Sequence, residues 1–165
     1  MITIAALYHF ARSADDLADE GHEPAHHSLD ALGEYRADLQ NCLSHTNIES
    51  VHWPHVFGPL RLAAQQYQLP AQPLFDLLDV FEQDVVYTSV GQGYRNRAEL
   101  LGYCRRSANP VGRLMLHAVG EPYAQCNAAS FAASDHICTS LQLINFWQDM
   151  AKDALAGRVY IPQDV

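Results

Sequence analysis

Carboxylate side chains cluster near the start of the chain, where four of them fall within six residues: Asp15, Asp16, Asp19 and Glu20. The cluster ends an apolar run without Gly or Pro, so the pattern predicts a helix over residues 2–18 with Gly21 as its stop signal. Carboxylates at the C-terminal end of a helix oppose its dipole by about 0.3 to 1 kcal/mol each. A cation would relieve this cost, and Asp15 and Asp19, one turn apart, can share a metal ion. The same polar stripe comprises Tyr8, Arg12, Asp15 and Asp19.

A second polar stripe lies near the other end of the chain, with side chains three, four and four residues apart: Gln142, Asn145, Asp149 and Asp153. The other faces of the same predicted helix carry apolar side chains, including Leu141, Leu143, Ile144, Phe146 and Trp147. One acidic cluster alone is commonly no more than a solvated helix end. Two Asp-x-x-x-Asp pairs, however, can face each other across a helical bundle. Hard oxygen ligands with room for water suit Mg²⁺ that bridges phosphate oxygens.

Helical periodicity accounts for most of the chain, and no segment alternates as a strand would. We expect six helices: residues 2–18, a helix capped by Ser28, residues 54–68, a helix opened by Gln72 and Pro73, a helix from Asn96 that Pro110 kinks, and a helix from about Tyr123 to Gly157. Their apolar stripes and the position of the acidic stripes near helix ends indicate an all-α bundle with a central cavity.

Short signals place several helix ends. Ser28 can cap the second helix, and Asn96 with Glu99 three residues later offers a capping box. Residues 88–96 contain two Gly residues and are predicted to form a loop. Near the expected kink at Pro110, the small Gly112 would let an apolar ligand approach the backbone. A kinked helix that only packs fits the same spacing equally well.

Composition limits the classes of function. The 165 residues are 48% hydrophobic and 18% charged, which fits a globular protein with a sizeable core. The formal net charge of −9 leaves no basic footprint for nucleic acid and no general attraction to anionic lipid. The four Cys residues lack paired metal-ligand spacing, so we expect free thiols in a reducing cytosol. No apolar run reaches the length of a transmembrane helix.

Other motifs for chemistry are weak. His52 and His55 have the spacing of metal ligands, but Pro54 between them favours a surface turn. Gly91 and Gly93 lack the third glycine and the βαβ context of a dinucleotide site, so they are interpreted as a turn. The two aspartate stripes therefore carry the functional hypothesis.

The acidic segments resemble a known family. Residues 11–20, residues 145–153 and the following residues 157–162 are similar to the two aspartate-rich motifs of the squalene and phytoene synthase family. Within that family, residues 103–112 and the sequence Phe-Trp-Gln-Asp at residues 146–149 most resemble the hydroxysqualene synthases of bacterial hopanoid biosynthesis. The resemblance extends over nearly the whole chain.

The resemblance implies a role for each matching residue. Four aspartates would hold Mg²⁺ ions that bridge the leaving diphosphate: Asp15, Asp19, Asp149 and Asp153. Three side chains would hold the diphosphate oxygens, Arg12, Arg158 and Tyr160, and Tyr8 and Gln148 are further substrate-binding positions. Gln148 stands where the family often has a basic residue. The loss of that charge would suit delivery of water as well as weaker retention of diphosphate. Gln142 and Asn145 would orient ligands or place a water. The hydrocarbon cavity would be lined by Tyr103, Val111 and Gly112.

The resemblance also implies an isoprenoid synthase-like fold in one all-α domain, residues 1–165. We expect this domain to be incomplete at both ends, with the cavity faces of residues 74–85 and 123–147 open to water. The implied reaction is ionisation of presqualene diphosphate and capture of the cation by water to give hydroxysqualene. The alternatives are a head-to-head prenyltransferase that makes squalene or phytoene from farnesyl diphosphate, and a non-catalytic family member. We expect a cytoplasmic protein that contacts the membrane peripherally when its product is released.

Overall fold

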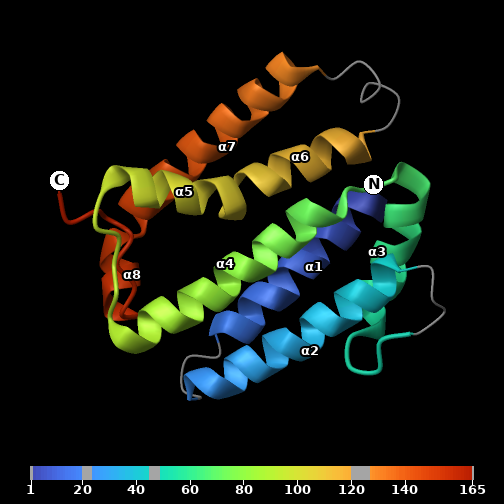
Figure 1. Cartoon of the computed structure of the whole chain (residues 1–165), viewed down its shortest axis with the longest axis horizontal. Coiled ribbons are helices and arrows are strands. Elements are labelled where there is room, and N and C mark those ends of the chain that lie inside the picture. The colour runs from blue at the N-terminus through green and yellow to red at the C-terminus, as the bar shows by residue number, and fades with distance from the viewer. Residues whose placement is uncertain (1, 20–23, 45–48, 120–126, 165) are drawn as a thin grey trace.

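The computed structural model describes residues 2–19, 24–44, 49–119 and 127–164. Within these ranges the chain forms helices and no strand, as the periodicity predicts (Figure 1). The helices in chain order are α1 (Ile2–Asp19), α2 (Ala25–Leu43), α3 (Pro54–Tyr67), α4 (Ala71–Val90), α5 (Arg97–Ser107), α6 (Asn109–Ala118), α7 (Ala128–Gln148) and α8 (Met150–Leu155).

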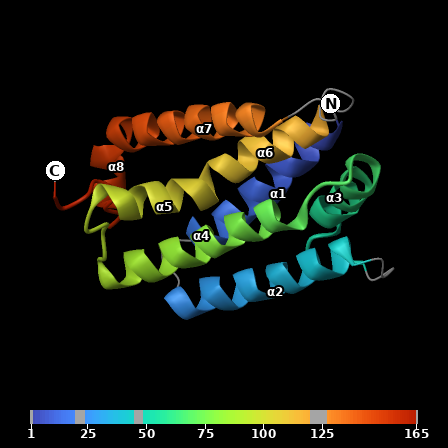
Figure 2. The same cartoon turned by 45° about the horizontal axis from the view of Figure 1, so that its top comes forward.

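The helices form two groups that meet at α1 and α4. Helix α1 packs on α2, α3 and α4, and these four helices bury the main apolar core. Helices α5 and α6 follow one another along α4, and α7 packs against both of them (Figure 2). A second apolar cluster joins α4, α5 and α7 to the C-terminal segment. The aspartate-bearing end of α1 therefore lies beside the segment that follows α8.

An aromatic cluster anchors α1 to its neighbours. The ring centroids of Phe10 and Tyr35 lie 5.5 Å apart, and that of Phe57 on α3 lies 4.7 Å from Tyr35. The Tyr35 hydroxyl donates a hydrogen bond of 3.0 Å to the backbone carbonyl of Phe10, so its buried polar atom is satisfied. Burial raises the pKa of Tyr35, and the hydroxyl remains a donor. These contacts fix the position of α1, which carries the first acidic stripe.

Two predicted helix ends differ from those in the structure. Helix α2 begins at Ala25 with Pro24 as its N-cap, and Ser28 is buried inside the helix rather than capping it. The fixed φ of proline makes Pro24 a suitable entry to a helix four residues earlier than predicted. Helix α4 continues to Val90, so residues 88–90 are helical and not loop. Gly91 ends it in the left-handed conformation, with φ of 62°. The expected stop at Gly21 lies outside the described residues.

The predicted cap of α5 is confirmed in part. The Asn96 side chain accepts a hydrogen bond of 3.0 Å from the Glu99 amide. The Glu99 carboxylate accepts from the Arg95 amide, one residue before the Asn96 amide that a full capping box uses. Pro110 lies in the first turn of α6, after α5 ends at Ser107, so the expected kinked helix is two helices.

The last predicted helix is also divided. Helix α7 ends at Gln148 and α8 begins at Met150, with Asp149 in the break between them. The ψ of Asp149 is 3°, which takes the chain out of helical geometry for one residue. The described part of α7 is capped by Asn127, whose side chain accepts from the Ala129 and Ser130 amides. The expected start at Tyr123 lies outside the described residues.

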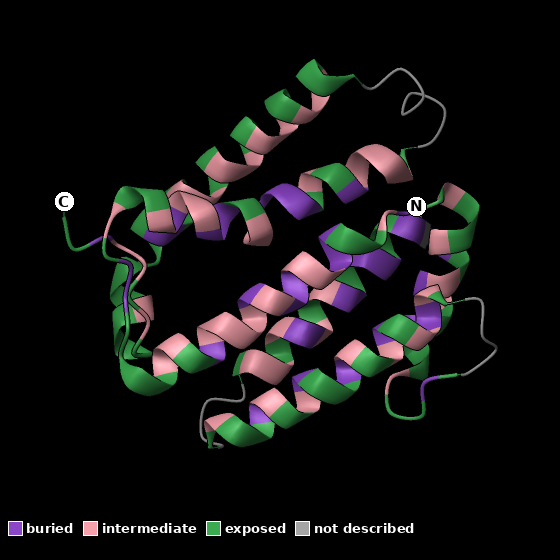
Figure 3. Cartoon of the chain, viewed as in Figure 1, coloured by how far each residue is buried: buried purple, intermediate pink, exposed green. Residues whose placement is uncertain are grey.

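The expected exposure of apolar faces is wrong for α4. Its side chains Leu74, Leu77, Leu78 and Val85 are buried in the main core. Helix α7, in contrast, displays exposed apolar side chains, including Ile137, Leu141, Ile144 and Trp147. Figure 3 shows the difference between α4, with its buried positions, and the largely exposed α7. The apolar stripe of α4 faces other helices, whereas that of α7 has no helix over it among the described residues.

Two further expectations concern cysteine and the membrane. Cys42, Cys104 and Cys138 are free thiols, as predicted, and Cys126 lies outside the described residues. Among the described helices, none combines the length and apolar character needed to cross a membrane.

We predict that Phe10→Ala lowers the free energy of unfolding by about 3 to 5 kcal/mol, because it leaves a cavity beside Tyr35 and Phe57. Urea denaturation measures the change. Leu62→Ala, which removes a side chain 67% exposed on α3, is the control and should change stability by less than about 0.5 kcal/mol. Equal effects of the two substitutions would contradict the assignment of the core.

Candidate active site

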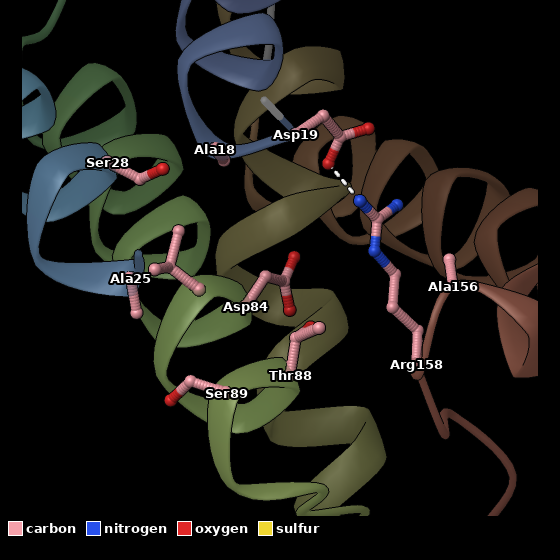
Figure 4. A pocket seen from close by; sticks show the side chains of 10 residues that line it. Ala18, Asp19, Ala25, Ser28, Asp84, Thr88, Ser89, Ala156 and Arg158 are labelled. Atoms are coloured by element: carbon pink, nitrogen blue, oxygen red, sulfur yellow. Dashed lines mark hydrogen bonds and ion pairs between the residues drawn. The ribbon is translucent and has the colours of Figure 1, made fainter. Parts of the chain in front are cut away.

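A cavity of about 220 Å³ joins the two ends of the chain. It lies among α1, α4, α5, α7 and the segment after α8, and its lining comprises Asp15, Ala18, Asp19, Val80, Phe81, Asp84, Tyr103, Ser107, Gln142, Arg158 and Tyr160. A second cavity of about 310 Å³ extends from it toward α2. The two share Ala18 and three charged residues, Asp19, Asp84 and Arg158, which Figure 4 shows turned toward one another. The first acidic stripe is thus brought beside a cation from the C-terminal segment.

Arg158 forms an ion pair with Asp19 across 139 residues of sequence. A turn at Gly157 places it there, because Gly157 has a φ of 76°, which few other residues adopt at low cost. The Arg158 amide then donates to the Asp153 carbonyl at 2.8 Å and fixes the turn against α8. The structure therefore brings Arg158 into contact with Asp19 of the first aspartate motif, and the assignment of both residues to a diphosphate site stays a prediction.

Asp84 is a carboxylate of this cavity that the sequence analysis missed. It lies on α4, and the Tyr103 hydroxyl donates to its Oδ2 atom at 2.6 Å. Burial raises the pKa of Asp84 to about 7, against the opposing effects of the Tyr103 hydrogen bond and the Arg158 charge. A signal was available in the sequence: Asp84 follows Leu77 by seven residues and Val80 by four, so it occupies the buried face of an apolar helix. An acidic residue at such a position is rare unless a polar or charged group pairs with it.

Aromatic rings close one side of the cavity. The ring centroids of Tyr103 and Tyr160 lie 5.7 Å apart, and Tyr160 stacks on Phe146 at 4.2 Å. Burial, with Asp84 as a further cause, raises the pKa of Tyr103 well above its ordinary value, so its hydroxyl stays protonated and donates. The Gln163 amide donates to the Tyr94 carbonyl at 3.0 Å and holds the C-terminal segment in place. Rings in this arrangement can stabilise a nearby cation through their faces.

The carboxylates of Asp15 and Asp19 on α1 repel each other. Burial raises the pKa of Asp15, and the neighbouring charge of Asp19 raises it further. Arg12 partly offsets this effect, because it forms ion pairs with Asp15 at 3.1 Å and with Asp16 at 2.7 Å. Tyr8 is exposed, with its ring against His9, and does not line the cavity.

The second acidic stripe is only partly brought to the cavity. Gln142 lines it, whereas Asn145, Gln148 and Asp149 are exposed. Asp153 is partly buried, and its pKa is raised by burial and by Asp149 and Asp19 against the charge of Arg158. The break at Asp149 turns α8 away from the line of α7, which separates the stripe.

No group of three or more carboxylate, imidazole or thiol side chains is arranged as a metal site in the described part of the chain. The donor set nevertheless suits Mg²⁺, because Asp15 and Asp19 are adjacent hard oxygen ligands whose mutual repulsion a divalent cation would remove. Few protein ligands leave room for water and for diphosphate oxygens. The four-aspartate magnesium site therefore stays a prediction.

Two of the three residues expected to line a hydrocarbon cavity, Val111 and Gly112, lie elsewhere. Val111 is exposed on α6. Gly112 faces α7, where an added Cβ atom would come within 2.6 Å of the Cys138 Sγ atom. The small residue therefore permits close packing of α6 on α7, in agreement with the packing alternative. Of the predicted hydrocarbon contacts, Tyr103 alone lines the cavity described above.

Known proteins resemble this chain over nearly its full extent. A family model described as squalene/phytoene synthase matches residues 2–165. The chain is 40% identical over 162 residues to the hydroxysqualene synthase of Sinorhizobium fredii, a match that covers 98% of this chain and 50% of that protein. It is 37% identical over 163 residues to the hydroxysqualene synthase of Rhodopseudomonas palustris, with the same coverage. The phytoene synthase of Mycobacterium bovis is 29% identical over 161 residues, covering 98% of this chain and 48% of that protein.

A solved structure agrees with these matches. The crystal structure of the squalene synthase HpnC from Alicyclobacillus acidocaldarius superposes with a TM-score of 0.81 at 28% identity, covering 98% of this chain and 56% of that one. The expected fold is thereby confirmed. The chain spans about half the length of the relatives it matches. The family model and the relatives confirm the resemblance seen in the aspartate motifs, and the chain belongs to the squalene/phytoene synthase family.

Proposed function

We propose that this chain provides the diphosphate-ionising site of an enzyme that converts presqualene diphosphate to hydroxysqualene. The observation that carries the proposal is the pairing of Arg158 with Asp19 in a cavity that also holds Asp15 and Asp84. A cation beside several carboxylates suits a ligand that brings both metal ions and phosphate oxygens. The identity to two hydroxysqualene synthases supports this choice of reaction.

The residues of the cavity have complementary tasks in this proposal. Asp15 and Asp19 would hold Mg²⁺, with Asp149 and Asp153 joining them as substrate binds, and the metal would neutralise charge on the leaving diphosphate. Arg158 exchanges its bond to Asp19 for the diphosphate oxygens. Arg12 lies one turn before Asp16 and can contact the outer phosphate oxygens.

The hydrocarbon end of the substrate would meet the aromatic side of the cavity. Once the diphosphate leaves, the faces of Tyr103 and Tyr160 would stabilise the carbocation, and Phe146, stacked on Tyr160, would hold that ring in place. Asp84 acts through Tyr103, because its hydrogen bond fixes the direction of the phenol. Gln142 is a polar lining residue without charge, and it would position the water that captures the cation.

A second candidate is a head-to-head prenyltransferase that acts on farnesyl diphosphate. The solved structure that resembles this chain is called a squalene synthase, and phytoene synthases are among the relatives. Both candidates require the same diphosphate site. They differ in the fate of the cation and in the identity of the substrate.

We predict that Mg²⁺ binds at least about ten-fold more tightly when inorganic diphosphate is present, because the protein supplies few of the oxygens that Mg²⁺ requires. Isothermal titration calorimetry measures both affinities. The double variant Asp15→Asn, Asp149→Asn should lose the dependence on diphosphate. Glu34→Gln removes an exposed carboxylate of α2 and should leave it unchanged. Equally tight Mg²⁺ binding with and without diphosphate would argue against the assigned ligands.

The product distinguishes the two candidates. We expect presqualene diphosphate and Mg²⁺ to give an alcohol whose oxygen comes from solvent, at a rate that NADPH does not change. Mass spectrometry after incubation in ¹⁸O-labelled water is the measurement, on this chain and on a chimaera that supplies the remaining length of the Sinorhizobium fredii relative. A hydrocarbon formed only with NADPH, or condensation of two farnesyl diphosphates as the main activity, would favour the prenyltransferase.

Asp84 makes stability depend on pH in a defined direction. An unfolded aspartate titrates near about 3.9, whereas the pKa of Asp84 in the folded chain is about 7. The folded state therefore binds the extra proton between these values, and stability is lost as pH rises from about 4 to 7. We expect Asp84→Asn to reduce this loss by roughly 2 to 4 kcal/mol, from about 1.4 kcal/mol per pKa unit.

Urea denaturation at a series of pH values tests the effect of Asp84→Asn. The control is Asp30→Asn, an exposed carboxylate of α2, which should keep the pH dependence of the unmodified chain. Identical pH profiles for Asp84→Asn and the unmodified chain would show that Asp84 is not the buried, proton-binding group.

A further inference from the structure

A polar groove, separate from the two cavities described above, lies on the opposite side of α5 from the candidate active site. Its volume is about 740 Å³, and it is lined by Asp76, Arg97, Leu101, Arg105, Arg106, Asn109, Arg113, Asp135, His136, Thr139, Ser140 and Leu143. Leu101 and Arg105 each lie two residues from Tyr103, which at about 100° per residue places them on the far side of the helix. The groove and the candidate active site share no lining residue.

The groove concentrates positive charge on an acidic protein. Four of the ten Lys and Arg residues of the chain line it, against two carboxylates, Asp76 and Asp135. With His136 neutral, the lining carries a formal charge of +2 (four arginines minus two aspartates), whereas the whole chain carries −9. Like charges gathered in one concave surface repel each other, so the arrangement favours an anion.

Two of the arginines are held in place by protein contacts. Arg113 on α6 donates to both carboxylate oxygens of Asp135 on α7, at 3.0 and 2.6 Å. Arg106 donates to the Gln83 side-chain oxygen at 2.5 Å. These contacts join α5 to α4 and α6 to α7, and they give the groove a defined shape.

The other two arginines have no such contact. Neither Arg97 nor Arg105 makes a side-chain hydrogen bond or ion pair with the described residues, and they lie two turns apart on α5, on either side of Leu101. Within the described part of the chain, no protein group therefore occupies the donors of these two guanidinium groups. On α7, the Thr139 hydroxyl donates to Asn109 at 2.9 Å, and the neighbouring Ser140 supplies a further hydroxyl at the groove.

We propose that this groove binds a ligand that carries more than one phosphate group. Planar guanidinium groups match phosphate oxygens with paired hydrogen bonds, and Arg97 and Arg105 supply two such forks. The groove is more than three times the volume of the 220 Å³ cavity, which leaves room for a diphosphate or for a larger headgroup. This phosphate site needs no metal and is separate from the Mg²⁺-dependent site of the proposed function. Its ligand is either a free polyphosphate or the headgroup of an anionic lipid.

Calorimetric titration with inorganic diphosphate in EDTA tests the proposal without contribution from Mg²⁺. The variant Arg97→Gln, Arg105→Gln should bind at least about ten-fold more weakly than the unmodified chain. The matched control Arg95→Gln, Lys152→Gln also removes two positive charges, both outside the groove, and should bind within about two-fold of it. Circular dichroism verifies that both variants are folded. Equal binding by the two variants, or no binding by the unmodified chain to either diphosphate or the lipid vesicles described next, would overturn the proposal.

Vesicles distinguish the two sources of phosphate. The first measurement is sedimentation with phosphatidylcholine vesicles that contain phosphatidylinositol bisphosphate. The ligand is a lipid headgroup if the chain sediments with these vesicles, if Arg97→Gln, Arg105→Gln abolishes the sedimentation, and if diphosphate competes with it. Diphosphate binding without vesicle binding identifies a free ligand. Arg158→Gln separates this test from the proposed function, because it should weaken Mg²⁺-dependent diphosphate binding and leave binding in EDTA unchanged.

Discussion

Excess negative charge in a small cavity is the constraint on which the candidate site depends. Asp15, Asp19 and Asp84 line one cavity, and Arg158 is the cation among its lining residues. The Arg158 charge stabilises the ionised forms of Asp15 and Asp84 and pairs directly with Asp19, yet burial still raises the pKa of the first two carboxyl groups. Arg12 pairs with Asp15 from outside the cavity, but it also pairs with Asp16, so two guanidinium groups do not balance these four carboxylates. This imbalance is the physical reason to expect added cations, and phosphate oxygens can then share those cations with the protein.

The fold produces this charge cluster through a few local features. The packed rings of Phe10, Tyr35 and Phe57 fix α1 in the core, so that Asp15 and Asp19 line the cavity at its end. The left-handed turn at Gly157 reverses the chain after α8 and brings Arg158 back over α1. The Tyr160 ring then stacks on Phe146 and closes the cavity with an aromatic side. Charge, cation and aromatic surface thus come from segments far apart in sequence.

The sequence was sufficient to predict the features of the fold that depend on periodicity and residue spacing. It predicted the all-α fold and the acidic end of α1, because helical spacing and the two aspartate motifs are local signals. It missed Asp84, whose importance arises only from burial beside Tyr103. It also predicted a continuous helix through Asp149, because one residue with a ψ near zero leaves no mark on the pattern. The sequence also could not show that Gly112 serves packing, because the close approach of α7 to α6 is a tertiary contact.

A crystal structure with Mn²⁺ and diphosphate tests the central claim most directly, because Mn²⁺ replaces Mg²⁺ on oxygen ligands and scatters anomalously. The account predicts anomalous peaks between the diphosphate and the carboxylates of Asp15 and Asp19. It also predicts that the Arg158 guanidinium has left Asp19 for the diphosphate oxygens. Metal peaks away from Asp15 and Asp19, or an Arg158–Asp19 pair that persists beside bound diphosphate, would contradict it.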